Sequence, residues 1–222
     1  MKPVAVVLCG CGRADGSEIH ESVSVLIHLD RVGLPYQCFA PDAPQAEVVD
    51  HLSGKPVAES RNMLVEAARI ARGEIKPLSQ LDAAACSAIA FPGGFGAAKN
   101  LCTFARDGTN CTVRPDVAAA VRAFHEQKKP IALACIAPVI VAKVLGTAAG
   151  GPGCSITLGG PGDAPNAAAA MGATHVAKGV TEAHVDHAHR IITTPAYMCD
   201  TGPHGVFTGI GKMIDALAAM VR

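Results

Sequence analysis

Short apolar runs alternate along the chain with longer stretches in which apolar and polar positions are mixed. Runs of this kind are typical of strands buried on both faces of a parallel sheet, whereas the longer stretches have the period of helices. The pattern predicts strands at residues 4–9, 36–39, 88–91, 130–134 and 191–194. It predicts helices at residues 17–32, 61–72, 115–127, 137–145 and 210–221.

This alternation predicts an α/β fold with an open, mostly parallel sheet and helices on both faces. We expect one domain over residues 1–222, because no repeat and no linker divides the sequence. The Pro-rich residues 41–56 and the Gly-rich residues 146–162 are expected to be loops. Asp15 and Glu18 have the spacing of a capping box at the start of the first helix.

The composition of the chain limits the classes of partner that it can bind. The 19 basic and 19 acidic side chains cancel and form no basic block, which argues against nucleic acid as the main partner. No apolar run approaches the roughly 18 residues that a membrane span requires. The first apolar run is too short for a signal peptide, so we expect a cytoplasmic protein. Nine irregularly spaced cysteines favour reduced, buried thiols over a disulfide framework.

Cys135 directly follows the strand predicted at residues 130–134, and a helix is predicted to begin at Ala137. This is the pattern of a nucleophile elbow, which raises a reactive side chain above the carboxyl edge of the sheet. A helix N-terminus beside the sulfur favours the thiolate. The position alone is equally compatible with a buried core cysteine.

Two consecutive glycines, Gly93 and Gly94, follow the strand predicted at residues 88–91. Glycines there let backbone N–H groups approach a ligand closely. The amides of Gly94 and Ile136 are therefore candidates for an oxyanion hole. A tight turn between strand and helix explains the same glycines without any ligand.

Glu21 is a candidate proton carrier. It lies on the helical stripe that also holds Val25, Leu29 and Val32. A carboxylate on an apolar stripe should have a raised pKa, which suits proton transfer. The alternative is an exposed glutamate in the first turn, favoured by the helix dipole.

Two other patterns in the sequence partly resemble cofactor-binding motifs. Residues 10–16 have the spacing Gly-x-Gly-x-x-x-Gly, which departs from a dinucleotide loop. We expect this loop to line the Cys135 site instead, with Gly12, Gly93 and Asn100 next to the substrate. His184, Asp186, His187 and His189 match no zinc motif, so we expect a solvated turn and no metal.

Four motifs together resemble a known family. They are Gly-Ser-Glu-Ile-His-Glu at residues 16–21, Pro-Gly-Gly-Phe-Gly-Ala-Ala-Lys-Asn-Leu at 92–101, Cys-Ile-Ala-Pro at 135–138 and Thr-Thr-Pro-Ala-Tyr-Met at 193–198. The chain resembles the isoprenoid-biosynthesis glyoxalases, also called lycopene-enhancing or sigma cross-reacting proteins, of the ThiJ/PfpI superfamily. That resemblance implies a flavodoxin-like, class I glutamine amidotransferase-like fold and a homodimer.

The resemblance also implies a chemistry. Cys135 would be the nucleophile, Glu21 its carboxylate partner, and Gly94 and Ile136 the oxyanion donors. Glyoxal or methylglyoxal would form a hemithioacetal on Cys135 and leave as glycolate or lactate. No metal, glutathione or nucleotide cofactor is implied.

The chain departs from the pattern of that superfamily in two respects. PfpI-type peptidases place a histidine directly after the nucleophile, where this chain has Ile136. Several relatives carry a histidine on the strand after the nucleophile helix, but residues 156–160 hold none. Both departures argue against a peptidase or a glutaminase and leave proton transfer to Glu21. The alternative function is a redox-sensing or chaperone-like protein in which an acidic Cys135 is oxidised.

Overall fold

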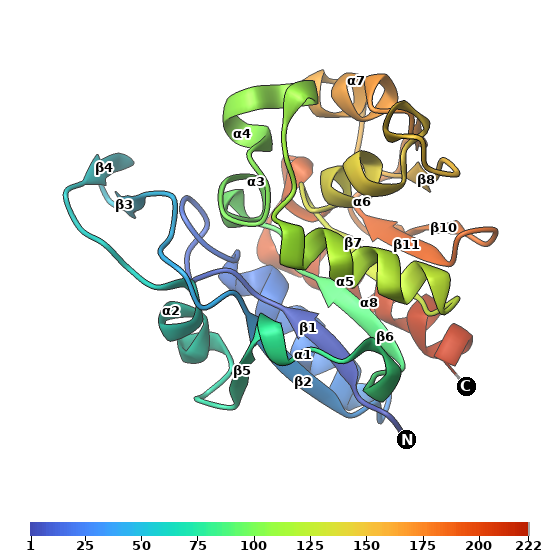
Figure 1. Cartoon of the computed structure of the whole chain (residues 1–222), viewed down its shortest axis with the longest axis horizontal. Coiled ribbons are helices and arrows are strands. Elements are labelled where there is room, and N and C mark those ends of the chain that lie inside the picture. Colours follow the sequence, from blue (N-terminus) through green and yellow to red (C-terminus); the bar gives the residue numbers. More distant parts are fainter. Residues whose placement is uncertain (222) are drawn as a thin grey trace.

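A seven-stranded sheet runs through the computed structural model, which describes residues 1–221 (Figure 1). The strand order is β10–β11–β7–β6–β1–β2–β5, and all neighbours are parallel except β10 and β11. The strands are β1 (Val4–Val7), β2 (Tyr36–Ala40), β5 (Ile75–Pro77), β6 (Ala88–Phe91), β7 (Ile131–Ala134), β10 (His184–Asp186) and β11 (Ile191–Thr194). This confirms the predicted open, mostly parallel α/β sheet.

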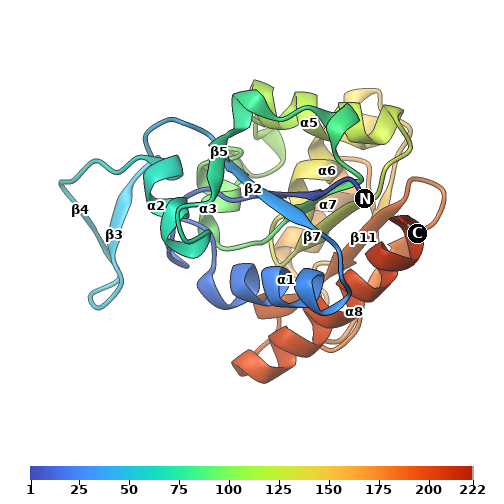
Figure 2. The same cartoon turned by 90° about the horizontal axis from the view of Figure 1, so that it is seen from below.

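Helices cover both faces of the sheet, as predicted. One face packs against α1 (Ile19–Arg31), α2 (Met63–Ile70) and α8 (Pro203–Val221). The other packs against α5 (Pro115–Glu126) and α6 (Pro138–Leu145). Figure 2 shows α1 and α8 below the sheet and α5 and α6 above it. The remaining helices are α3 (Phe95–Lys99), α4 (Phe104–Asp107) and α7 (Asp163–Ala170).

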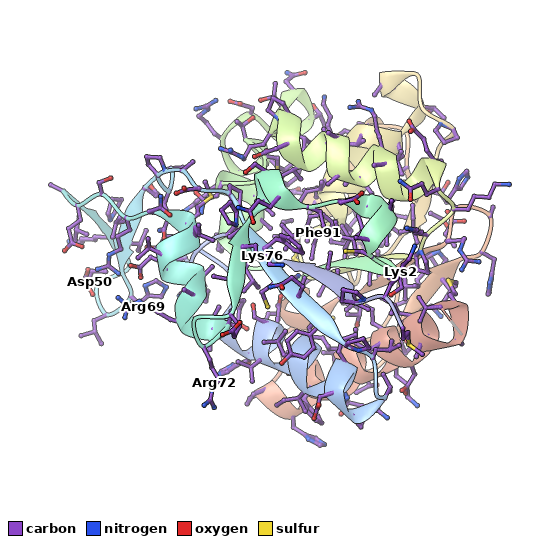
Figure 3. All side chains as sticks on the ribbon, turned by 60° about the horizontal axis from the view of Figure 1, so that its bottom comes forward. Lys2, Asp50, Arg69, Arg72, Lys76 and Phe91 are labelled. Atoms are coloured by element: carbon purple, nitrogen blue, oxygen red, sulfur yellow. The ribbon has the colours of Figure 1, made fainter. Side chains whose placement is uncertain are left out.

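The alternation of side chains along β1 explains why the sheet is buried on both faces. Val4 and Val6 join the core under α1 and α8, while Ala5 and Val7 join the core under α5 and α6. All four are at most 1% exposed. Phe91, labelled in Figure 3, is fully buried in the second core. The continuous apolar run in the sequence is thus the signature of a two-sided strand.

The loop prediction for residues 41–56 was wrong in part. Strands β3 (Val48–Asp50) and β4 (Lys55–Val57) form an antiparallel hairpin that projects from one end of the molecule (Figure 1). Figure 3 labels Asp50 on it. The Val49 N–H donates to Asp15 Oδ2 at 2.8 Å, so the base of the hairpin is tied to the loop after β1. Leu52, at the turn, is 99% exposed.

The same hydrogen bond corrects the predicted capping box. Asp15 is used by the hairpin, and the N-cap of α1 is Glu18, whose carboxylate accepts the Glu21 N–H at 2.7 Å. The helix therefore begins at Ile19, two residues later than expected.

The C-terminal half holds more regular structure than its pattern indicates. The Gly-rich residues 146–162 contain the short strand β8 (Ser155–Ile156), which pairs with β9 (Thr174–His175). The terminal helix starts at Pro203 instead of residue 210.

All nine cysteines are free and seven are buried, as expected. Within residues 1–221, no helix combines the length and hydrophobicity needed to cross a bilayer.

Candidate functional site

Three loops meet beyond the carboxyl ends of adjacent strands. They follow β1 (residues 8–18), β6 (residues 92–94) and β7 (residue 135). The chain goes from β1 to β2 on one side and later returns to β6 on the other, so the strand order reverses here. A crevice at such a switch point is the common ligand site of open α/β sheets.

Cys135 stands in this crevice with a strained backbone. Its φ is +58°, a left-handed value that is uncommon for a residue other than glycine. The Cys135 N–H donates to the Thr194 carbonyl at 3.0 Å, so the strand pairing ends at the same residue. The sulfur accepts the backbone N–H groups of Gly94 and Ile136. The turn between β7 and α6 thus directs the thiol toward two amide donors.

Glu21 reaches the same point from α1. Its side chain is 0% exposed, and it hydrogen bonds with the Cys135 thiol. The carboxylate also accepts the N–H of Gly93 at 2.8 Å and that of Tyr197 at 3.5 Å. Val25 joins it on the buried stripe of α1, which the helical period predicts.

Only glycine fits beside this pair. A Cβ on Gly93 would lie 2.4 Å from the Cys135 Cβ and 2.7 Å from Glu21 Oε2. Gly94 has a φ of +93°, and a Cβ there would lie 2.5 Å from the Glu18 backbone nitrogen. The two glycines therefore let the backbone after β6 approach both side chains closely.

Electrostatics couple the thiol and the carboxylate. Burial and the neighbouring charge of Glu18 raise the pKa of Glu21 to about 7, against the N–H donors that lower it. Burial and the Glu21 charge raise the pKa of the Cys135 thiol well above its ordinary value, although the amides of Gly94 and Ile136 oppose this. The acidic thiol expected from the helix N-terminus is therefore a wrong prediction, because α6 begins three residues later, at Pro138, and burial is the larger effect.

An open cavity of about 670 Å³ lies above the pair. Cys135, Gly94 and Ile136 line it. Its polar side chains come from the loop after β1, the start of α1 and the segment after β11: Arg13, Glu18, His20, Tyr197, Asp200 and Thr201. His20 Nδ1 and the Tyr197 hydroxyl are 2.7 Å apart.

None of the three predicted lining residues lines the cavity: Gly93 contacts Glu21 below it, and Asn100 and Gly12 lie elsewhere. Asn100 is buried, and its side-chain amide donates to the carbonyls of Cys9 (3.0 Å) and Asp15 (2.8 Å) while its oxygen accepts the Ala46 N–H at 2.8 Å. Gly12 is also buried, with the His51 ring next to it. Neither lines the cavity, because both hold the loop after β1 in place.

The structure brings Cys135, Glu21, Gly93, Gly94 and Ile136 together. Sequence reasoning missed the lining residues Arg13, His20 and Tyr197 as individual site residues. The available signal was their membership in the glycine-rich loop and in the motifs at residues 16–21 and 193–198.

The two segments that resemble cofactor-binding motifs, residues 10–16 and 184–189, have structural roles. A Cβ on Gly16 would lie 2.4 Å from the Cys11 backbone nitrogen, so the loop at residues 10–16 folds tightly on itself. Asp186 accepts the N–H groups of Ser155 and His189, and His184 lies in strand β10 and not in a turn. Within residues 1–221, no three side chains of His, Cys, Asp or Glu gather as a metal site.

Comparisons with known proteins place the chain among relatives. No protein-family model matches it. The rat protein "ES1 protein homolog, mitochondrial" is 52% identical over 95% of this chain and 81% of the relative. The human protein "Glutamine amidotransferase-like class 1 domain-containing protein 3, mitochondrial" is 51% identical over 95% of this chain and 80% of the relative. Since these relatives are named mitochondrial, the cytoplasmic location expected from the sequence is corrected.

Solved structures agree with these relatives. An isoprenoid biosynthesis protein with an amidotransferase-like domain from Ehrlichia chaffeensis superposes with a TM-score of 0.92 and 36% identity, over 100% of both chains. Drosophila melanogaster DJ-1beta shares the fold, with a TM-score of 0.56 and 16% identity over 100% of this chain and 91% of that one. The chain therefore belongs to the ES1 family of glutamine amidotransferase-like class 1 proteins, whose fold is that of the DJ-1/ThiJ/PfpI superfamily.

Proposed function

We propose that the protein is a glutathione-independent glyoxalase, which converts glyoxal to glycolate and methylglyoxal to lactate. One observation carries this proposal: the Cys135 thiol hydrogen bonds with the buried Glu21 carboxylate and also accepts two backbone N–H groups. A nucleophile, a base and two oxyanion donors are what addition to an aldehyde requires.

In the first step the Cys135 sulfur bonds to the aldehyde carbon, and the thiol proton passes to Glu21. The carbonyl π electrons move onto the oxygen, which becomes an oxyanion. The amides of Gly94 and Ile136 already point to the sulfur, so they are within reach of an oxygen on the carbon bonded to it. This oxygen then takes up the proton from Glu21, which leaves a hemithioacetal and a free carboxylate.

In the second step Glu21 removes the hydrogen of the hemithioacetal carbon as a proton. The electron pair forms a double bond to the adjacent carbon, and the carbonyl oxygen of that carbon becomes an enediolate oxygen. Glu21 then returns its proton to the adjacent carbon, and the hydroxyl proton of the hemithioacetal passes from the first oxygen to the second, which gives a thioester on Cys135. Water hydrolyses the thioester and releases the hydroxy acid, so no oxidant or reductant is consumed. A carboxyl group whose pKa is raised to about 7 suits both directions of transfer near neutral pH.

Both the enzyme and the redox sensor react through a Cys135 thiolate. Burial disfavours that thiolate until a base accepts the proton. Glu21 is in place to do so when the substrate arrives.

Product formation by Cys135→Ala tests the proposal. We expect the purified protein to form lactate from methylglyoxal, and Cys135→Ala to lose this activity. Cys38→Ala is the matched control, because Cys38 is also buried but lies on β2, outside the cavity. Full activity in Cys135→Ala would contradict the mechanism.

We also propose that the protein is a homodimer that associates through the outer face of α1. Ile19, Val23 and Ile27 are 45%, 38% and 48% exposed, and they recur every four residues. At 100° per residue they form one apolar stripe opposite the buried face of the helix. A second copy would cover this stripe with its own.

A further inference from the structure

The proposed enediol step leaves one oxygen without an assigned donor. When Glu21 removes the proton from the hemithioacetal carbon, negative charge develops on the oxygen of the second carbonyl. Gly94 and Ile136 serve the first oxygen, and Glu21 holds the proton in transit. Since an enediolate oxygen needs a hydrogen-bond donor to be stabilised, another group of the cavity must supply it.

The Tyr197 hydroxyl is in a position to do so. Tyr197 lines the cavity together with Cys135. Its backbone N–H contacts Glu21 Oε1 at 3.5 Å, so the residue is anchored to the base. Its hydroxyl extends to His20 Nδ1, 2.7 Å away, and the two rings lie 5.9 Å apart. His20 Nδ1 in turn lies 3.8 Å from Glu18 Oε1.

The direction of the His20 hydrogen bond decides what the phenol can do. When His20 carries its proton on Nδ1, it donates to the phenol oxygen, and the Tyr197 O–H is free to donate into the cavity. In this tautomer the N–H also faces the Glu18 carboxylate, whose Oε1 lies 3.8 Å from Nδ1. The hydrogen bond from His20 therefore orients one O–H donor in the cavity that Cys135 also lines.

We propose that Tyr197 donates its hydroxyl proton in a hydrogen bond to the second carbonyl oxygen of the substrate, and that His20 is the residue that positions it. This inference rests on the proposed function. It supplies the donor that the chain lacks at residues 156–160, where no histidine is present. Arg13 and Thr201 line the same cavity and are the competing donors.

Tyr197→Phe removes only the hydroxyl and is the first test. We expect kcat/KM for methylglyoxal to fall roughly 100-fold, mostly through kcat, as for the loss of an oxyanion donor. The rate at which iodoacetamide alkylates Cys135 should stay the same. Tyr36→Phe is the matched control, because Tyr36 is the other tyrosine and lies on β2.

His20 has its own pair of variants. The amide nitrogen of asparagine occupies nearly the position of histidine Nδ1, so His20→Asn keeps a donor to the phenol. His20→Leu fills the space without one. We expect His20→Leu to lower kcat about as much as Tyr197→Phe, and His20→Asn to recover a large part of the loss.

A binding measurement separates failure of this inference from failure of the proposed function. Methylglyoxal that forms a hemithioacetal protects Cys135 from iodoacetamide, whether or not the reaction proceeds to lactate. If the wild-type protein forms no lactate, the proposed function is wrong, and several-fold weaker protection in Tyr197→Phe would still support the donor. Equal protection and equal turnover in Tyr197→Phe and the wild type would overturn the inference, as would an absence of protection in both.

Discussion

At the scale of single residues, the most unusual feature is a carboxylate buried among apolar side chains. Glu21 is 0% exposed, on the face of α1 that packs in the core. Hydrogen bonds partly offset the cost of burying its charge, because the N–H groups of Gly93 and Tyr197 and the Cys135 thiol contact the carboxylate. Those contacts do not offset burial, so its pKa rises to about 7 and the folded protein holds this proton more tightly than the unfolded chain.

The stability of the protein should therefore fall between about pH 4 and pH 7 because of Glu21. A raised folded-state pKa contributes stability that is complete below the unfolded value and is lost as pH rises through the folded value. A rise from 4.5 to about 7 corresponds to about 3 kcal/mol. Glu21→Gln should gain about that much over the wild type between about pH 4 and pH 8 in urea unfolding. Glu74→Gln, at an exposed position, is the control, and parallel curves for Glu21→Gln and wild type would disprove the coupling.

Much of the site could be predicted at this scale, but not all of it. Cys135 could be predicted because it stands between a predicted strand and a predicted helix. Glu21 could be predicted because it is a carboxylate on an apolar helical stripe. The contact between His20 and Tyr197 joins residues that are 177 positions apart, so no local period reveals it. The prediction for Asn100 was wrong because a polar residue beside a glycine-rich turn can hydrogen bond with neighbouring backbone as readily as with a substrate. Asn100 donates to the Cys9 carbonyl.

At the scale of elements, the turn after β6 decides whether the site can form. Gly93 places its backbone between Cys135 and Glu21, and a Cβ there would come within 2.4 Å of the first and 2.7 Å of the second. It would also lie 2.9 Å from the Ala134 carbonyl at the end of β7. Because one of these neighbours is the backbone of a central strand, it cannot move aside without disturbing the sheet.

Gly93→Ala should therefore destabilise the protein by about 1–3 kcal/mol, the usual cost of overpacking. It should also separate the thiol from the carboxylate, which glyoxalase activity would report. Gly160→Ala is the matched control, because nothing lies within 4 Å of its added Cβ. The account of the turn would be wrong if both variants showed the same urea midpoint.

Elements whose apolar runs are buried on both faces could be predicted from the sequence, and those with mixed composition could not. The start of α8 contains Pro203, Gly205 and Gly209, which are poor helix formers. It is helical because tertiary packing outweighs propensity: Val206 is fully buried, and a Cβ on Gly209 would lie 2.0 Å from the Val180 carbonyl. The β3–β4 hairpin depends on a similar long-range contact, from Val49 to Asp15.

At the scale of the whole molecule, the two faces of the sheet are covered but the outer surface of α1 is not. Its inner face packs against the sheet and α8 (Figure 2). Its outer stripe, Ile19, Val23 and Ile27, exposes large aliphatic side chains in a row. Such a row costs solvation free energy unless a partner covers it.

Placing a charge at Ile27, the most exposed residue of this stripe, should therefore separate the proposed dimer. Burying an unpaired carboxylate in an apolar contact costs several kcal/mol, which exceeds what a modest interface can spare. We expect Ile27→Glu to sediment as a monomer at a concentration where the wild type sediments as a dimer. Val65→Glu, at a 61% exposed position on α2, should leave the dimer intact. A monomeric wild type, or a dimeric Ile27→Glu, would show that α1 is not the interface.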